Sequence, residues 1–146
     1  MKKMLEKTLG TPDKDAYEFV NLAKEDVKKN NGYFAYHTDQ NDEFKKCIYL
    51  SQTMIHYSKY FLDTVIVDAT YKRNRFNLIL VNIVGFNNHG QNIRLGFGLL
   101  TEETVQSYEW IFKHLKQGWN QKEPDNFICD ESEAIINGNN YFLYLD

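Results

Sequence analysis

The sequence predicts an α/β protein with a mixed sheet, in which a three-strand antiparallel meander is followed by a crossover helix and a parallel fourth strand. Three apolar runs between residues 64 and 100 follow one another with short polar links, which is typical of a meander. A helical pattern at 105–119 then leads to a short apolar run at 126–129. Because a long helix between two buried strands usually returns the second strand parallel to the first, we expect this last run beside the first strand.

The chain has the size and composition of one folded domain. Its 146 residues are 42% hydrophobic and 15% aromatic, which excludes a disordered chain. The formal net charge of −3 lacks the basic excess of nucleic-acid binders, so we expect this acidic segment alone to bind DNA weakly or not at all. No apolar stretch approaches the roughly 18 residues of a membrane span, and the charged amino-terminal residues include no apolar signal region. We therefore expect an intracellular protein that does not enter a membrane.

A helix and a β-hairpin are expected before the meander. Thr11 is a suitable N-cap, Pro12 suits the first helical position, and apolar residues then recur at three-to-four spacing. Two β-like runs follow with a polar loop between them, and Ser51 is expected to cap a second, short helix. The predicted ranges are 12–29 for the helix, 33–37 and 43–50 for the hairpin strands, and 51–61 for the short helix.

The first strand of the meander is predicted to begin at Thr64. It contains the continuous apolar run 65–67, which is typical of a strand covered on both faces, and it ends in Asp68, Ala69, Thr70 and Tyr71. The other two strands are predicted at 77–86 and 92–100. Asn and Gly residues at 87–90 favour a turn between them because they tolerate positive φ. A basic cluster after the first strand is interpreted as a solvated turn and comprises Lys72, Arg73 and Arg75.

The run TEET at 101–104 supplies a Thr cap and two acids beside the positive end of the helix at 105–119. The preceding segment GFGLL, at 96–100, lacks the third glycine of a phosphate loop, so we expect its glycines to permit close packing against a helix. The strand at 126–129 delivers Asp130, and another helix is expected to begin at 133–137.

The cysteines and histidines form no pattern typical of a metal site or a catalytic nucleophile. Cys47 and Cys129 lie in apolar runs without CxxC or Cys/His spacing, so we interpret both as reduced core residues. The histidines are scattered over different predicted elements and are interpreted as structural or exposed; they are His37, His56, His89 and His114.

Asp68 and Asp130 are the candidate catalytic and metal-binding residues, because each follows an apolar run directly. Either residue taken alone is more typical of an ordinary turn or helix-capping residue at a strand end. If the two strands are neighbours, however, both carboxylates emerge together and repel each other unless a cation lies between them. Such hard oxygen ligands suit Mg²⁺ or Mn²⁺ and phosphoryl transfer on a nucleic-acid backbone. Glu131 and Glu133 lie nearby in sequence, but adjacency does not aim a side chain, and neither is selected.

The stretch from 67 to 115 resembles the MULE transposase domain of Mutator-like elements, which FAR1-type domesticated plant regulators share. The resemblance rests on the DATYK-to-NRF opening, the NNHGQ turn, the GFGLLTEET run and the SYEWIF helix, in that order, followed by a short strand that ends in Asp. Upstream, a DA-containing helix, the aromatic strand YFAY, a hairpin and an aromatic helix extend the resemblance to about residues 10–138.

This resemblance implies a ribonuclease-H-like fold and a DDE-type mechanism with Mg²⁺ or Mn²⁺, whose first and second acids fall on Asp68 and Asp130. The third acid of the family, a Glu on a later helix, has no counterpart before Asp146. We therefore expect residues 1–62 to lead into the domain, residues 63–138 to form a C-terminally truncated part of it, and residues 139–146 to be an aberrant tail.

Three functions are consistent with these observations. The first is a fragment of a transposase that catalyses metal-dependent phosphoryl transfer on transposon ends in the nucleus and is inactive alone. The second is a domesticated, FAR1-like module that serves in interaction or in DNA-associated regulation without catalysis. The third is a degenerate reading frame. The resemblance leaves homo-oligomer formation open.

Overall fold

The computed structural model describes residues 12–71, 77–139 and 142. The predicted Thr11 cap and the basic cluster after the first meander strand lie outside the described residues, as does most of the predicted tail. The helices are α2 (Pro12–Asn30), α3 (Gln52–Ser58), α4 (Val105–Gly118) and α5 (Glu133–Gly138). The strands are β1 (Tyr33–Thr38), β2 (Phe44–Leu50), β3 (Thr64–Thr70), β4 (Ile79–Phe86), β5 (Asn92–Leu100) and β6 (Asn126–Cys129).

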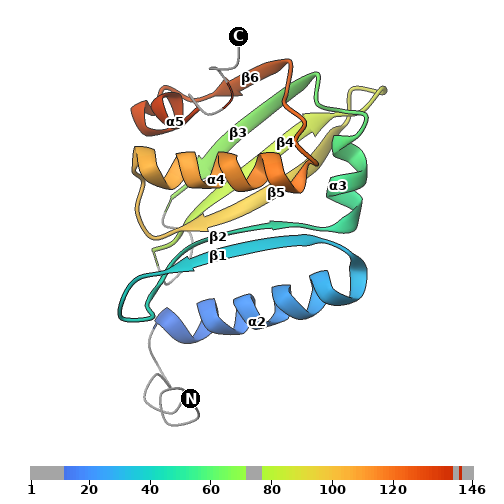
Figure 1. The fold of residues 1–146 in the computed structure, drawn as a ribbon. Coiled ribbons are helices and arrows are strands. Elements are labelled where there is room, and N and C mark those ends of the chain that lie inside the picture. Colours follow the sequence, from blue (N-terminus) through green and yellow to red (C-terminus); the bar gives the residue numbers. More distant parts are fainter. Residues whose placement is uncertain (1–11, 72–76, 140–141, 143–146) are drawn as a thin grey trace.

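The described strands form one six-stranded sheet in the order β1-β2-β5-β4-β3-β6 (Figure 1). β3, β4 and β5 pair antiparallel in sequence, and β6 returns beside β3 in parallel. This arrangement confirms the predicted meander, crossover helix and parallel fourth strand. The hairpin of β1 and β2 was also predicted, but its second strand pairs antiparallel with β5 and so extends the same sheet.

The sheet is covered on its two faces by different helices (Figure 1). Consecutive residues of a strand point to opposite faces, and in β2 Ile48 belongs to the main core with α4, whereas Cys47 packs with α2. The main core under α4 draws on β2 to β5 and on the helix residues Tyr108, Ile111 and Phe112. The core under α2 is smaller and lies over the β1–β2 side of the sheet.

Two glycines of β5 allow α4 to lie directly on the strand. A Cβ atom on Gly98 would lie 2.6 Å from the Cδ1 atom of Ile111, and one on Gly96 would lie 3.0 Å from the Cδ1 atom of Leu115. The prediction that the glycines of the GFGLL segment permit close packing against a helix is therefore confirmed.

β3 differs from its prediction in the position of Asp68 and in burial. It runs to Thr70, so Asp68 lies within the strand rather than at its end. Val65, Val67 and Ala69 are buried, whereas Asp68 is exposed and Ile66 is half-buried. The interpretation of a strand covered on both faces was therefore wrong: one face packs against the core, and the other accommodates a carboxylate within the strand.

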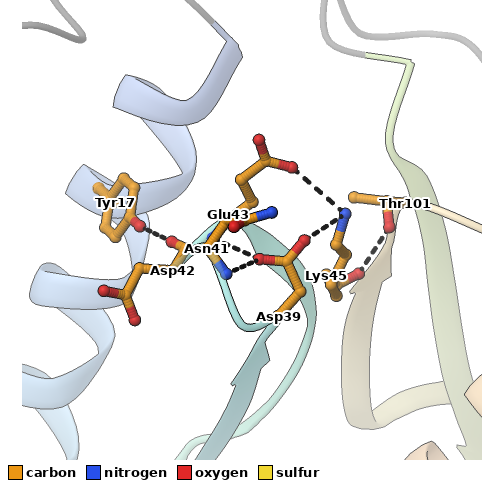
Figure 2. Close-up of polar contacts among 7 residues, drawn as sticks. All are labelled: Tyr17, Asp39, Asn41, Asp42, Glu43, Lys45 and Thr101. Atoms are coloured by element: carbon orange, nitrogen blue, oxygen red, sulfur yellow. Dashed lines mark hydrogen bonds and ion pairs between the residues drawn. The ribbon is translucent and has the colours of Figure 1, made fainter.

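The loop between β1 and β2 is fixed by polar contacts to α2 and to the segment after β5 (Figure 2). Asp39 accepts hydrogen bonds from two backbone N–H groups of the loop and pairs with Lys45 at 3.1 Å. The Tyr17 hydroxyl of α2 donates to the backbone carbonyl of Asp42, and the Thr101 hydroxyl donates to the carbonyl of Lys45 at 3.1 Å. These contacts connect the hairpin to elements on both sides of it.

The two cysteines are free, as predicted, but only Cys47 is a core residue. Cys129 is half-buried at the end of β6. From the predicted tail, Phe142 packs against the aromatic rings of Phe112, Phe127 and Trp119. Among the described residues, none of the helices is long and apolar enough to cross a membrane.

Candidate functional site

Asp68 and Asp130 occupy neighbouring positions on adjacent parallel strands. The last pair of the β3–β6 ladder is Val67 and Cys129, and each aspartate is the next residue along its strand direction. Both side chains are exposed. The parallel return of β6 therefore brings the two predicted carboxylates to the same edge of the sheet, as the chain order predicted.

The two aspartates are held differently by the backbone. Asp68 lies inside β3, where its antiparallel neighbour is Asn82 of β4. Because Val67 and Ala69 point into the core under α4, Asp68 points to the opposite face. Asp130 follows the end of β6, and its Oδ1 atom accepts a hydrogen bond of 3.1 Å from the backbone N–H of Ser132. Asp130 is thus also a turn residue, which was the structural interpretation considered for it.

A third carboxylate, that of Glu103, is hydrogen-bonded to residues that follow both aspartates along the chain and was not selected from the sequence. Its Oε1 atom accepts hydrogen bonds from the hydroxyls of Tyr71, of Tyr108 at 3.1 Å and of Ser132 at 2.9 Å. Tyr71 directly follows β3, Tyr108 belongs to α4, and Ser132 precedes α5. A single carboxylate oxygen therefore connects the segments that follow the two aspartates to α4.

The structure confirms the predicted Thr cap and places Glu103 directly before it. Thr104 is the N-cap of α4, and its side chain accepts a hydrogen bond from the backbone N–H of Ser107 at 3.1 Å. Glu103 therefore precedes the cap, and the first turn of α4 contains no acid. No spacing pattern marked Glu103, because its partners Tyr71 and Ser132 lie on segments remote from it in sequence.

The pKa values of Tyr71 and Tyr108 are raised, partly by the negative charges of nearby carboxylates. Burial raises the pKa of Tyr71, and the hydrogen bond to Glu103 and the charges of Glu103, Asp130 and Asp68 raise it further. The pKa of Tyr108 is raised by burial first and then chiefly by Glu103, with a smaller contribution from Asp130. Three carboxylates therefore act on the Tyr71 hydroxyl, which stays protonated and donates to Glu103.

The remaining candidates do not complete a metal-binding cage. Glu131 and Glu133 are exposed. Within the part of the chain that the structure describes, His, Cys, Asp and Glu side chains form no group of three or more that could hold a metal ion. His37, His56 and His89 are exposed, and His114 is hydrogen-bonded to the Tyr33 hydroxyl at 2.6 Å and packs on Trp110. The interpretation of the histidines as structural or exposed is confirmed.

Comparison with known proteins places this chain among transposase-derived domains. Residues 64–141, which include β3 to β6 and both aspartates, match the MULE transposase domain. The chain belongs to this family.

Similar proteins from Arabidopsis thaliana carry the name FAR1-RELATED SEQUENCE. Number 6 is 29% identical over 147 residues, which cover 92% of this chain and 20% of that protein. Number 5 is 33% identical over 76 residues, covering 52% of this chain and 10% of that protein, and number 9 is 31% identical over 77 residues, covering 52% and 14%. The chain thus spans a fifth or less of the length of these relatives.

Proposed function

We propose that this chain is part of a DDE-type, transposase-derived domain with a ribonuclease-H-like fold, in which Asp68 and Asp130 hold Mg²⁺ or Mn²⁺ for phosphoryl transfer on DNA. The observation that carries the proposal is the parallel ladder of β3 and β6, after whose last pair both aspartates follow. The meander, crossover helix and parallel return of the MULE region support the ribonuclease-H-like assignment.

The donor set suits a hard divalent cation. Mg²⁺ is commonly held by one or two carboxylates, keeps several waters and also binds substrate phosphates. Two exposed carboxylates on adjacent strands provide such an open site, and the charge of Glu103 adds to its negative field. When bound, the metal would polarise a phosphate and activate a water or a 3′ hydroxyl for in-line attack.

The neighbouring residues of this chain would position the two aspartates rather than transfer protons. β3 fixes Asp68 through its pairing with β4, and the turn at Ser132 fixes Asp130 through its Oδ1 atom. The proposed substrate is transposon-end DNA in the nucleus, gripped largely by other parts of a full-length protein, because a net charge of −3 gives this segment little attraction for phosphates. We expect no strand cleavage or joining by this chain alone, because its described residues place no third metal-binding side chain with Asp68 and Asp130.

A second candidate function is a non-catalytic module that serves in interaction or DNA-associated regulation. Two observations favour it: the relatives named above are FAR1-related sequences, and the described residues contain no group of three metal-binding side chains. In this case the fold is retained while metal binding is dispensable.

Calorimetric titration with Mn²⁺ separates the two functions. We expect binding by the wild-type chain that is lost in Asp68→Asn and in Asp130→Asn. Asp125→Asn is the matched control, because Asp125 is also an exposed aspartate but lies at the opposite end of β6. Equal binding by all four proteins, or none by the wild type, would contradict the metal site and favour the non-catalytic module. Nicking of element-end DNA that Asp68→Asn abolishes would contradict the expected inactivity.

A further inference from the structure

We propose that Glu103 is a positioning residue for the Asp68–Asp130 pair: its carboxylate connects the segments that follow both aspartates to the start of α4. The inference rests on the proposed metal site, since it assigns to Glu103 the task of keeping that site's two ligands together. Glu103 is not offered as a third ligand, because the described acids form no three-membered metal-binding group.

The hydrogen bonds of Glu103 lie where they can control both aspartates. Tyr71 follows Asp68 by three residues along the chain, and Ser132 follows Asp130 by two. Both hydroxyls donate to the same Oε1 atom, so the end of β3 and the turn after β6 share one acceptor. Tyr108 donates to that atom from α4 and thereby fixes the carboxylate relative to the core.

Such a connection is needed because the backbone ladder stops short of the site. β6 has four residues, lies at the edge of the sheet and pairs with β3 only as far as Val67 and Cys129. Beyond this pair, the position of Asp130 depends on its bond to the backbone of Ser132 and on the bond from the Ser132 hydroxyl to Glu103. The separation of the two aspartates therefore depends on side-chain contacts.

Ser132 provides an independent indication that the contact to Glu103 is favoured. It occupies the N-cap position of α5, where a serine side chain normally accepts a hydrogen bond from the backbone of the first turn. Here it makes no such cap bond and donates to Glu103 instead. A serine hydroxyl can donate and accept at the same time, so the competition is between two positions of the side chain. Hydrogen bonds to an ionised carboxylate are about twice as strong as those between neutral groups, which favours the position that reaches Glu103 over the position that caps α5.

The first test measures backbone hydrogen exchange in the metal-free protein. Glu103→Ala is expected to speed the exchange of amides at 69–71 and at 130–133, whereas Glu103→Gln, which keeps an acceptor oxygen, should largely restore protection. Ser132→Ala should loosen only 130–133, and Tyr71→Phe only 69–71. Ser58→Ala is the control, because it removes a buried hydrogen bond of 2.7 Å to Ile55 at the opposite end of the sheet.

The second test is Mn²⁺ affinity. Loss of an outer residue that orients metal ligands typically weakens binding by about 10–100-fold, so Glu103→Ala should raise the Mn²⁺ dissociation constant by roughly tenfold or more. Glu103→Gln keeps the acceptor oxygen but loses the charge, so it should bind Mn²⁺ more weakly than the wild type and more tightly than Glu103→Ala. Ser58→Ala should lose thermal stability without losing affinity. If the wild-type chain binds no Mn²⁺, the proposed function fails, while the exchange measurement still decides the role of Glu103.

Specific outcomes would overturn the proposal. One is unchanged exchange at 130–133 in Glu103→Ala. Another is an increase in exchange spread over the whole chain, which is the pattern expected from a general loss of stability and from Ser58→Ala. A Gln variant that behaves like the Ala variant would show that acceptance of the hydroxyl hydrogen bonds does not position the pair. Where Glu103→Ala fails to fold, the local effects of Ser132→Ala and Tyr71→Phe decide the matter.

Discussion

Replacing Gly98 by alanine tests the packing of α4 on β5 most directly. The added Cβ atom would lie 2.6 Å from the Cδ1 atom of Ile111 and 3.0 Å from the backbone oxygen of Cys47. The Ile111 atom is the end of a side chain, but the Cys47 carbonyl belongs to β2, which pairs with β5 at this point. The helix side chain can shift, whereas the strand cannot shift without weakening the ladder.

The expected loss of stability follows from these contacts. Overpacking a core by one methyl group costs about 1–3 kcal/mol, and the rigid neighbour places Gly98→Ala in the upper half of this range. Gly96→Ala is the matched control, since its Cβ atom would meet only side-chain atoms of Leu115 and Leu50, at 3.0 Å and beyond. We expect about 1 kcal/mol or less for it. At roughly 3 °C per kcal/mol, Gly98→Ala should lower the Tm by about 6–9 °C.

A double-mutant cycle with Ile111→Val identifies the clashing atom. This substitution deletes Cδ1 and alone should cost about 0.5–1.5 kcal/mol in the free energy of unfolding. In the Gly98→Ala background it should instead recover part of the lost stability. Urea denaturation of the four proteins measures the coupling. Additivity within about 0.5 kcal/mol, or a Gly98→Ala variant as stable as Gly96→Ala, would refute the reasoning.

The remaining predictions concern two titrating groups. Burial raises the pKa of the Cys47 thiol to about 12, so iodoacetamide should modify Cys129 in the native protein and Cys47 only after unfolding, as mass spectrometry would show. Equal native rates would contradict this expectation. The Tyr49 hydroxyl donates to Asp26 and lowers the pKa of that carboxyl. Because the folded-state pKa lies below the unfolded value, the stabilisation is fully present above about pH 4 and is lost as the pH falls through the folded pKa. Tyr49→Phe should therefore raise the pKa of Asp26 in an NMR titration and should cost more stability at pH 7 than at pH 2.5; a constant difference would be inconsistent with this bond.

Local patterns were sufficient to predict the elements and the order of the meander. Spacing located α2 and α4, turn residues located the links, and a long helix between apolar runs predicted the parallel pairing of β6 with β3. The neighbouring positions of Asp68 and Asp130 followed from that topology alone. Their role as metal ligands remains a prediction.

Other features could not be predicted because they depend on contacts between segments remote in sequence. The backbone of a strand can pair with the open edge of many other strands, so the sequence did not indicate that β2 pairs with β5. Asp68 was expected at the end of its strand because a carboxylate interrupts the apolar run. It lies within β3 because its side chain points to the exposed face of the strand. Glu103 and Tyr71 are 32 residues apart, so their hydrogen bond depends on the tertiary fold, which brings the end of β3 to the start of α4.

The pairing of β2 with β5 has a consequence for how the family region can be isolated. The MULE match begins at residue 64, whereas the sheet continues across β5 into the hairpin. A polypeptide that starts at residue 64 would leave unpaired backbone groups along the β5 edge, next to the apolar Phe97 and Leu99. Such an open edge recruits strands from other molecules. The amino-terminal hairpin covers this edge, so the solubility of the MULE-matched region is expected to depend on residues that lie outside it.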